Sequence, residues 1–164
     1  MEIERTSVVD EVVAANERYA SAFANEGLPA APRRKLAIVT CMDARLDPAR
    51  FLGLEEGDAH VLRNAGGLVN DETIRSLVIS HHRLGTEEAI VIGHTDCGML
   101  TITNDDLHER LGPDSEDIDF QPFHDVAESV RRSVEKIRSH PLLRDPFGAT
   151  GFVYNVGTGR IEPV

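Results

Sequence analysis

Two apolar segments of the chain are each followed by cysteine and charged side chains, and the second also carries a histidine. The first reads LAIVTCMDAR over residues 36–45, and the second reads AIVIGHTDC over residues 89–97. Short, continuous apolar runs of this kind are typical of buried strands in a parallel sheet. The sequence therefore predicts one strand that ends directly at Cys41 and another that ends at His94, with Cys97 just beyond it.

Helical and strand patterns alternate around these two segments. Apolar spacing, capping residues and glycine punctuation predict four helices and two further strands. The helices are expected at residues 6–25, 71–84, 100–111 and 123–139, and the strands at residues 59–62 and 151–156. Strands alternating with helices indicate the α/β class, here a small, mainly parallel sheet flanked by helices with an N-terminal helical arm.

The length of 164 residues indicates one domain, 1–164, of which residues 1–28 form the arm. A chain of this size buries about 70% of its unfolded surface and needs no disulfide to fold. The first helix carries Val8, Val9, Val12 and Val13, which make it too apolar for an arm free in water. We therefore expect a homodimer or a dimer of dimers.

Charge and composition exclude several classes of protein. With 28 acidic and 17 basic residues, the net charge of −11 argues against nucleic-acid binding, and no apolar stretch is long enough for a membrane span. The first six residues, MEIERT, place acids where a secretory signal has a basic stretch, so we expect a cytoplasmic protein. In that reducing compartment the two cysteines are free thiols or metal ligands, or are simply buried.

The two strand ends also predict a binding site. Parallel sheets bind ligands beyond the carboxyl ends of their strands, where the strand order reverses. If the two strands are neighbours there, Cys41, His94 and Cys97 converge, although the first two are 53 residues apart. Zinc takes thiolate and imidazole ligands, and three protein ligands leave a fourth position for water or substrate. The pattern therefore indicates a catalytic Zn²⁺ site.

Asp43 and Arg45 follow the first of these ligands. On an extended segment, residues two apart project to the same side, so Cys41, Asp43 and Arg45 could face one crevice if the chain stays extended there. An aspartate held by an arginine stays ionised and can accept a hydrogen bond from an attacking water. The same carboxylate could instead bind the zinc and close the site, and the sequence leaves both states open.

Three motifs together resemble a known family. The pattern C-x-D-x-R at residues 41–45, RNAGG at residues 63–67 and GHxxCG at residues 93–98 is similar to the β-class carbonic anhydrases, closest to their short bacterial and archaeal members. The resemblance implies a small parallel sheet, an N-terminal arm that wraps a dimer partner, and carbon dioxide and bicarbonate as the substrate pair.

The resemblance also implies roles for single residues. Cys41, His94 and Cys97 correspond to the zinc ligands of the family. Asp43 and Arg45 correspond to its catalytic dyad, with Asp43 as a fourth zinc ligand in a closed state. These assignments agree with the reading of the residues by their chemistry alone.

A substrate pocket is expected beside the zinc. Backbone N–H groups of Ala65, Gly66 and Gly67 could hold a substrate oxygen, because glycine permits close approach; a simple tight turn is the alternative. Many family members have a second glycine where this chain has Met99, which would make the pocket narrower and more apolar.

The expected function is zinc-dependent, reversible hydration of carbon dioxide to bicarbonate and a proton, the work of a carbonate dehydratase. One alternative is hydrolysis of carbon disulfide or carbonyl sulfide by the same fold. Another is a non-catalytic, zinc-stabilised interaction module in which Asp43 is a permanent fourth ligand.

Overall fold

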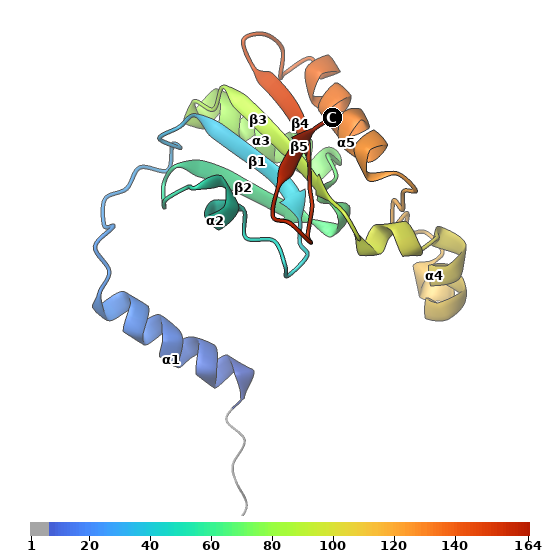
Figure 1. The fold of residues 1–164 in the computed structure, drawn as a ribbon, viewed down its shortest axis with the longest axis horizontal. Helices are drawn as coiled ribbons and strands as arrows, with labels where there is room; N and C mark the ends of the chain where they lie inside the picture. The colour runs from blue at the N-terminus through green and yellow to red at the C-terminus, as the bar shows by residue number, and fades with distance from the viewer. Residues whose placement is uncertain (1–6) are drawn as a thin grey trace, which may run out of the picture.

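The computed structural model describes residues 7–164, and a five-stranded sheet forms its centre (Figure 1). The strands are β1 (Leu36–Cys41), β2 (Ala59–Asn64), β3 (Glu88–His94), β4 (Gly148–Tyr154) and β5 (Ile161–Pro163). Their order is β2-β1-β3-β4-β5; the first four are parallel and β5 is antiparallel to β4. The predicted mainly parallel sheet is confirmed, and the strand order reverses between the neighbours β1 and β3.

Five α-helices and three short 3-10 turns accompany the sheet. They are α1 (Val8–Ser21), α2 (Pro48–Leu52), α3 (Asp71–Leu84), α4 (Asn104–Leu111), α5 (Val126–Ser139), η1 (Ala65–Gly67), η2 (Gly98–Thr101) and η3 (Pro113–Ser115). α3 keeps the predicted bounds because the Asn70 side chain accepts the Thr73 N–H at 3.0 Å and Gly85, with φ 75°, ends the helix. One hydrophobic core joins α3 and α5 to strands β1, β3 and β4.

Some element bounds differ from those predicted. The helix expected at 100–111 is divided into η2 and α4, because the Thr103 hydroxyl accepts a backbone N–H and starts α4 afresh. The last helix begins after its N-cap Asp125 rather than at residue 123. α2 and β5 were not predicted, since elements of five and three residues are too short to show a period.

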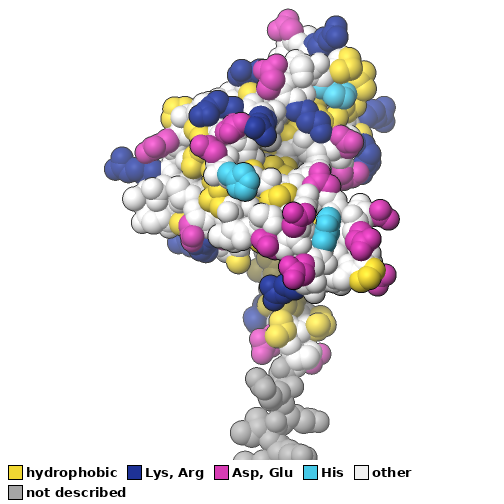
Figure 2. Space-filling model, turned by 90° about the vertical axis from the view of Figure 1, so that its right-hand side faces the viewer, with side chains coloured by type: hydrophobic (Ala, Val, Ile, Leu, Met, Phe, Trp, Pro, Cys, Tyr) yellow, Lys and Arg dark blue, Asp and Glu magenta, His cyan; other side chains and the backbone are white. Residues whose placement is uncertain are grey.

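The N-terminal arm projects away from the sheet (Figure 1). Figure 2 shows hydrophobic side chains on its surface, where Val8 is 74% and Val12 is 61% exposed. The Tyr19 hydroxyl donates to Glu56 at 2.6 Å and ties the arm to the loop before β2. The arm was predicted at residues 1–28, of which 1–6 lie outside the described residues; its assignment to one domain stays a prediction. No helix within residues 7–164 is long and apolar enough to cross a membrane.

Candidate metal centre

The ends of β1 and β3 bring the three predicted ligands together. Thr40 pairs with Ile92, so the two strands finish side by side. Cys41 is the last residue of β1, His94 is the last of β3, and Cys97 lies in the turn that follows. Their ligand atoms all lie within 4.8 Å of one another, and each residue is at most 5% exposed. The predicted convergence is confirmed.

The donor set and the state of His94 fit zinc. Zinc bonds of about 2.0–2.3 Å place tetrahedral ligand atoms about 3.3–3.8 Å apart, which three atoms within 4.8 Å can reach by small side-chain shifts. The Nδ1 of His94 donates to the Thr95 carbonyl at 2.9 Å, which leaves the lone pair on Nε2. That Nε2 is the one buried side-chain nitrogen or oxygen of residues 7–164 without a hydrogen-bond partner. A buried lone pair close to two thiols is available to bind zinc.

The two sulfur atoms have different proton affinities. The neighbouring Cys97 thiol, together with His94 and the backbone N–H groups of Asp43 and Gly66, lowers the pKa of Cys41. The same thiol contact, with burial, raises the pKa of Cys97. Burial lowers the pKa of His94, but the neighbouring Cys41 sulfur and the Thr95 carbonyl raise it by more. The pair therefore favours one thiolate beside one thiol, and binding of a metal by both sulfur atoms releases the remaining proton.

Asp43 and Arg45 form a bidentate ion pair beside this cluster. Arg45 Nε donates to Asp43 Oδ1 at 3.0 Å, and Arg45 Nη2 donates to Oδ2 at 2.8 Å. These bonds hold the pKa of Asp43 well below its ordinary value. Oδ2 lies 3.8 Å from His94 Nε2, so the carboxylate borders the metal position but stays outside the group of three ligand atoms. Its role as a fourth ligand in a closed state stays a prediction.

The route by which Asp43 and Arg45 meet differs from the prediction. The chain does not stay extended after β1 but turns, because the Arg45 N–H donates to Asp43 Oδ1 at 2.9 Å. Such a turn closed by an aspartate side chain is a common local alternative to extended structure. The expectation of a shared face on an extended segment was wrong, although the two side chains do meet.

Arg63 and Asn64 brace the site, and sequence reasoning assigned them no role. Arg63 Nε donates to the Cys41 carbonyl at 2.9 Å, and its Nη2 donates to the Asp43 carbonyl at 2.8 Å. Asn64 exchanges hydrogen bonds of 2.7 and 2.8 Å with the backbone of Leu68 and closes the loop over η1. An arginine and an asparagine at the end of β2, next to β1, are the signal that could have identified both.

The predicted pocket residues divide between buried and exposed positions. Gly66 and Gly67 are buried in η1 with φ of 83° and 65°, whereas Ala65 is exposed. The Gly66 backbone N–H helps to lower the pKa of Cys41 and so favours its thiolate. A side chain at Gly67 would lie 2.8 Å from the backbone nitrogen of Cys41. The loop therefore sits directly on the end of β1, and substrate binding by it stays a prediction.

Met99 belongs to an apolar cluster around the cysteines. Its backbone N–H lowers the pKa of Cys97, against the larger effects that raise it, and its side chain lies near Gly66 together with Phe123. The buried members are Cys41, Leu46, Cys97 and Met99, with Phe51, Leu100, Ile102, Phe123, Tyr154 and Val156 packed against them. These side chains come from several separate elements, so apart from the two cysteines only Met99 was predicted. They pack apolar groups around the two cysteine ligands, in addition to the charged pair of Asp43 and Arg45.

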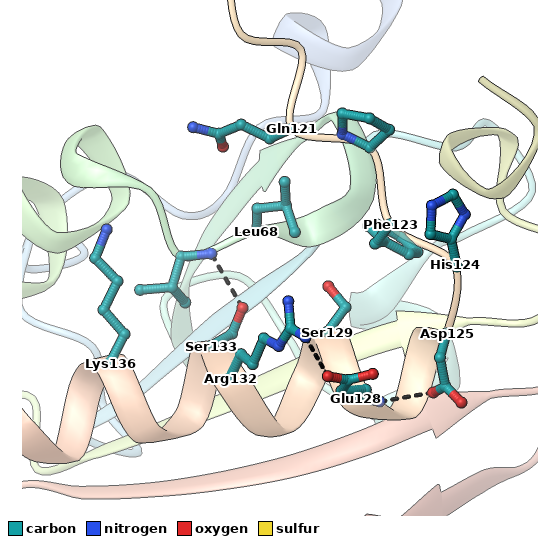
Figure 3. Close-up of a pocket in the computed structure, with 12 residues that line it drawn as sticks. Leu68, Gln121, Phe123, His124, Asp125, Glu128, Ser129, Arg132, Ser133 and Lys136 are labelled. Atoms are coloured by element: carbon teal, nitrogen blue, oxygen red, sulfur yellow. Dashed lines mark hydrogen bonds and ion pairs between the residues drawn. The ribbon is translucent and has the colours of Figure 1, made fainter. Parts of the chain in front are cut away.

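A separate cavity of about 350 Å³ lies between α5 and residues 121–125 (Figure 3). Its cationic side chains are paired, Arg132 with Glu128 and Lys136 with Asp71. Phe123 lines this cavity and also packs against the metal-site cluster. None of the three metal ligands lines the cavity, so Phe123 forms a wall between it and the metal position.

Comparisons with known proteins agree with this geometry. A family model described as carbonic anhydrase matches residues 36–161. Beta-carbonic anhydrase 1 of Mycobacterium bovis is 44% identical, with 96% of this chain and 98% of that protein covered. The crystal structure of a carbonic anhydrase from Streptococcus mutans is 46% identical, covers 98% of this chain and 99% of its own, and has a TM-score of 0.90.

A relative named for another substrate also matches. A carbon disulfide hydrolase from Acidithiobacillus thiooxidans is 35% identical over 79% of this chain and 77% of that protein. The family match runs from the first residue of β1 to the first of β5 and so includes both ligand-bearing strand ends. With the zinc-binding cysteines and histidine gathered at those ends, the chain belongs to the β-class carbonic anhydrases.

Proposed function

We propose that the protein catalyses the reversible hydration of carbon dioxide to bicarbonate and a proton. One observation carries the proposal: the partnerless Nε2 of His94 lies between two thiols and 3.8 Å from the ionised carboxylate of Asp43. That arrangement combines a metal position with a fixed hydrogen-bond acceptor next to it. A metal position with a fixed acceptor beside it can activate and orient a water molecule.

Cys41, His94 and Cys97 would hold the metal. Bound zinc supplies a Lewis acid that makes water nucleophilic near neutral pH. Asp43 accepts a hydrogen bond from the attacking water at Oδ2 and orients it. Because Arg45 holds the pKa of Asp43 so low, this carboxylate acts as an acceptor and does not take up the proton.

The apolar cluster suits the substrate. Carbon dioxide is small and apolar, so a pocket for it needs hydrophobic walls and few polar anchors. Met99 and Phe123 provide such a wall next to Gly66. Ala65, Gly66 and Gly67 remain the candidates for contact with a substrate oxygen, although the Gly66 N–H already serves a ligand sulfur.

Carbon disulfide is the second candidate substrate, because relatives bearing that name are 33–35% identical to this chain. It is a linear analogue of carbon dioxide with larger terminal atoms. The same metal position and dyad would serve both reactions, so the pocket walls decide between them.

The test measures both reactions on one metal-analysed preparation. Stopped-flow carbon dioxide hydration should follow the zinc content, and Asp43→Ala should lower kcat/KM by about 100-fold or more while zinc is retained. Asp117→Ala, at an exposed aspartate in the loop after α4, is the matched control. Sulfide release without hydration would instead favour the hydrolase. Retained zinc with neither activity would favour a non-catalytic module.

We also propose that a second copy of the chain covers the apolar face of α1, in a homodimer or a dimer of dimers. Val8, Val9, Val12 and Val13 form one stripe at i, i+1, i+4 and i+5, and each is at least 53% exposed. Sedimentation at micromolar concentration should show a dimer or larger, and Val9→Glu with Val12→Glu should yield monomers. Glu17→Gln on the same helix is the control, and a monomeric parent would contradict the proposal.

The chemistry of the ligands supports a location. Cys41 and Cys97 are free thiols, and a reducing compartment keeps such thiols available for a metal. We therefore place the protein in the cytoplasm.

A further inference from the structure

Asp96 occupies the turn between the ligands His94 and Cys97. Its φ of 56° lies in the left-handed region, which residues other than glycine rarely adopt and which aspartate and asparagine tolerate best. Asp96 is one of three non-glycine residues with positive φ in the described part of the chain. The backbone there is held in an uncommon conformation within a turn that carries two side chains of the metal site.

The contacts of Asp96 all lead to Arg45. Arg45 Nη1 donates to Asp96 Oδ2 at 2.7 Å, and Arg45 Nη2 donates to the Asp96 carbonyl at 3.0 Å. With the two bonds to Asp43, four of the five N–H groups of this guanidinium are engaged. Arg45 therefore joins the turn after β1 to the turn after β3.

This double attachment restrains the whole dyad. A guanidinium paired with Asp43 alone could swing together with its partner, because both belong to one turn. Bonds to the side chain and the carbonyl of Asp96 fix the guanidinium plane to the segment that carries His94 and Cys97. The Asp96 side chain is 78% exposed, so its ion pair adds little stability, and its contribution is geometric.

We propose that Asp96 is a positioning residue for the reaction. By holding Arg45 across the switch point, it keeps the Asp43 carboxylate directed at Arg45 beside the metal position and prevents it from turning onto the metal. The inference rests on the proposed function for its catalytic consequence, while the position of Asp43 can be read without any activity.

Three variants separate charge, shape and backbone. Asp96→Asn keeps the tolerance of positive φ and an acceptor oxygen, so it should retain kcat/KM for carbon dioxide hydration within about twofold. Asp96→Ala removes the side-chain acceptor and leaves only the backbone carbonyl, and Asp96→Gly does so while relieving the backbone. Both should lose about fivefold in kcat/KM with unchanged zinc content. Asp117→Asn is the control on an exposed aspartate.

Two further measurements identify the route of the effect. The visible spectrum of the Co²⁺-substituted protein reports the ligand set of the metal. Asp96→Ala and Asp96→Gly should shift it toward the spectrum of Arg45→Ala, and Asp96→Asn should not. In a double-mutant cycle, Asp96→Ala should cause no further loss in the Arg45→Ala background, because the two residues act as one unit.

Several results would overturn the proposal. One is that Asp96→Ala has the same activity and the same cobalt spectrum as the control, and another is that Asp96→Gly has the activity and spectrum of the parent. The proposal also fails if the losses in the double-mutant cycle are additive, or if the activity of all three variants falls only in proportion to their zinc content. A parent without hydration activity would defeat the proposed function instead, and the cobalt spectra would still decide whether Asp96 governs the position of Asp43.

Discussion

The contact between Gly67 and the end of β1 leads to a sharp prediction about stability. Gly67 has φ 65°, and a Cβ there would lie 2.8 Å from the Cys41 nitrogen and 2.9 Å from the Thr40 carbonyl carbon. Both are backbone atoms of a central strand, so neither can move without displacing a metal ligand. Gly53 is the matched control, because its φ is 64° and a Cβ would meet nothing within 4 Å.

The two substitutions differ by the clash alone. Placing alanine in the left-handed region costs about 1–2 kcal/mol, so Gly53→Ala should lower the free energy of unfolding by about 1 kcal/mol after its effect on the unfolded chain. Overpacking adds about 1–3 kcal/mol, so Gly67→Ala should lose about 2–4 kcal/mol. For a chain of this size each kcal/mol corresponds to about 2–4 °C in Tm.

Urea unfolding followed by circular dichroism measures this difference, with zinc content determined on the same samples. Gly67→Ala should have the lower midpoint and should retain less zinc, because its Cβ presses on Cys41. Equal midpoints for the two variants would refute the reasoning that η1 is packed rigidly against β1. Equal midpoints with zinc lost only from Gly67→Ala would refute the stability estimate and retain the link to the ligand.

Three further predictions follow from other contacts. Removing zinc with a chelator should lower Tm, because it leaves His94 Nε2 buried without a partner, and zinc but not magnesium should restore it. The Glu55 N–H and the Arg33 guanidinium lower the pKa of Asp58 in the folded state. The ionised carboxylate therefore stabilises the fold above its unfolded-state pKa of about 4, and this stabilisation is lost as the pH falls below that value. Asp58→Asn should therefore be less stable than the parent at pH 7, and the two urea midpoints should approach each other as pH falls below about 4. Met99→Ala should cost about 2–4 kcal/mol in urea unfolding, because the side chain is only 9% exposed, and an unchanged midpoint would show that the wall relaxes.

The metal ligands could be predicted because their signal is local and chemical. A strand of continuous apolar residues that ends at a cysteine, and another that ends at a histidine, bring the ligands to one sheet edge by topology alone. The long helix α3 was predicted for a similar reason, since Asn70 and Gly85 mark its ends.

The partners of Arg63 and the pairing of Arg45 with Asp96 could not be predicted, because these contacts join residues that are distant in sequence. Arg63 acts on backbone carbonyls 20 and 22 residues away, and Arg45 reaches Asp96 across 51 residues. Backbone carbonyls carry no sequence signal. The turn at Arg45 was missed for the opposite reason. Its hydrogen bond joins Arg45 to Asp43, only two residues away, and this local bond competes with the extended conformation.

The position of the ligands on either side of the β1–β3 boundary has a mechanical consequence. A metal bound by Cys41 at the end of β1 and by His94 and Cys97 after β3 would cross-link these two neighbouring strands. Local separation of the ends of β1 and β3 must then break a metal–ligand bond, so strand separation and metal release are coupled. The amide hydrogens that pair β1 with β3 should therefore exchange slowly for as long as the metal stays bound.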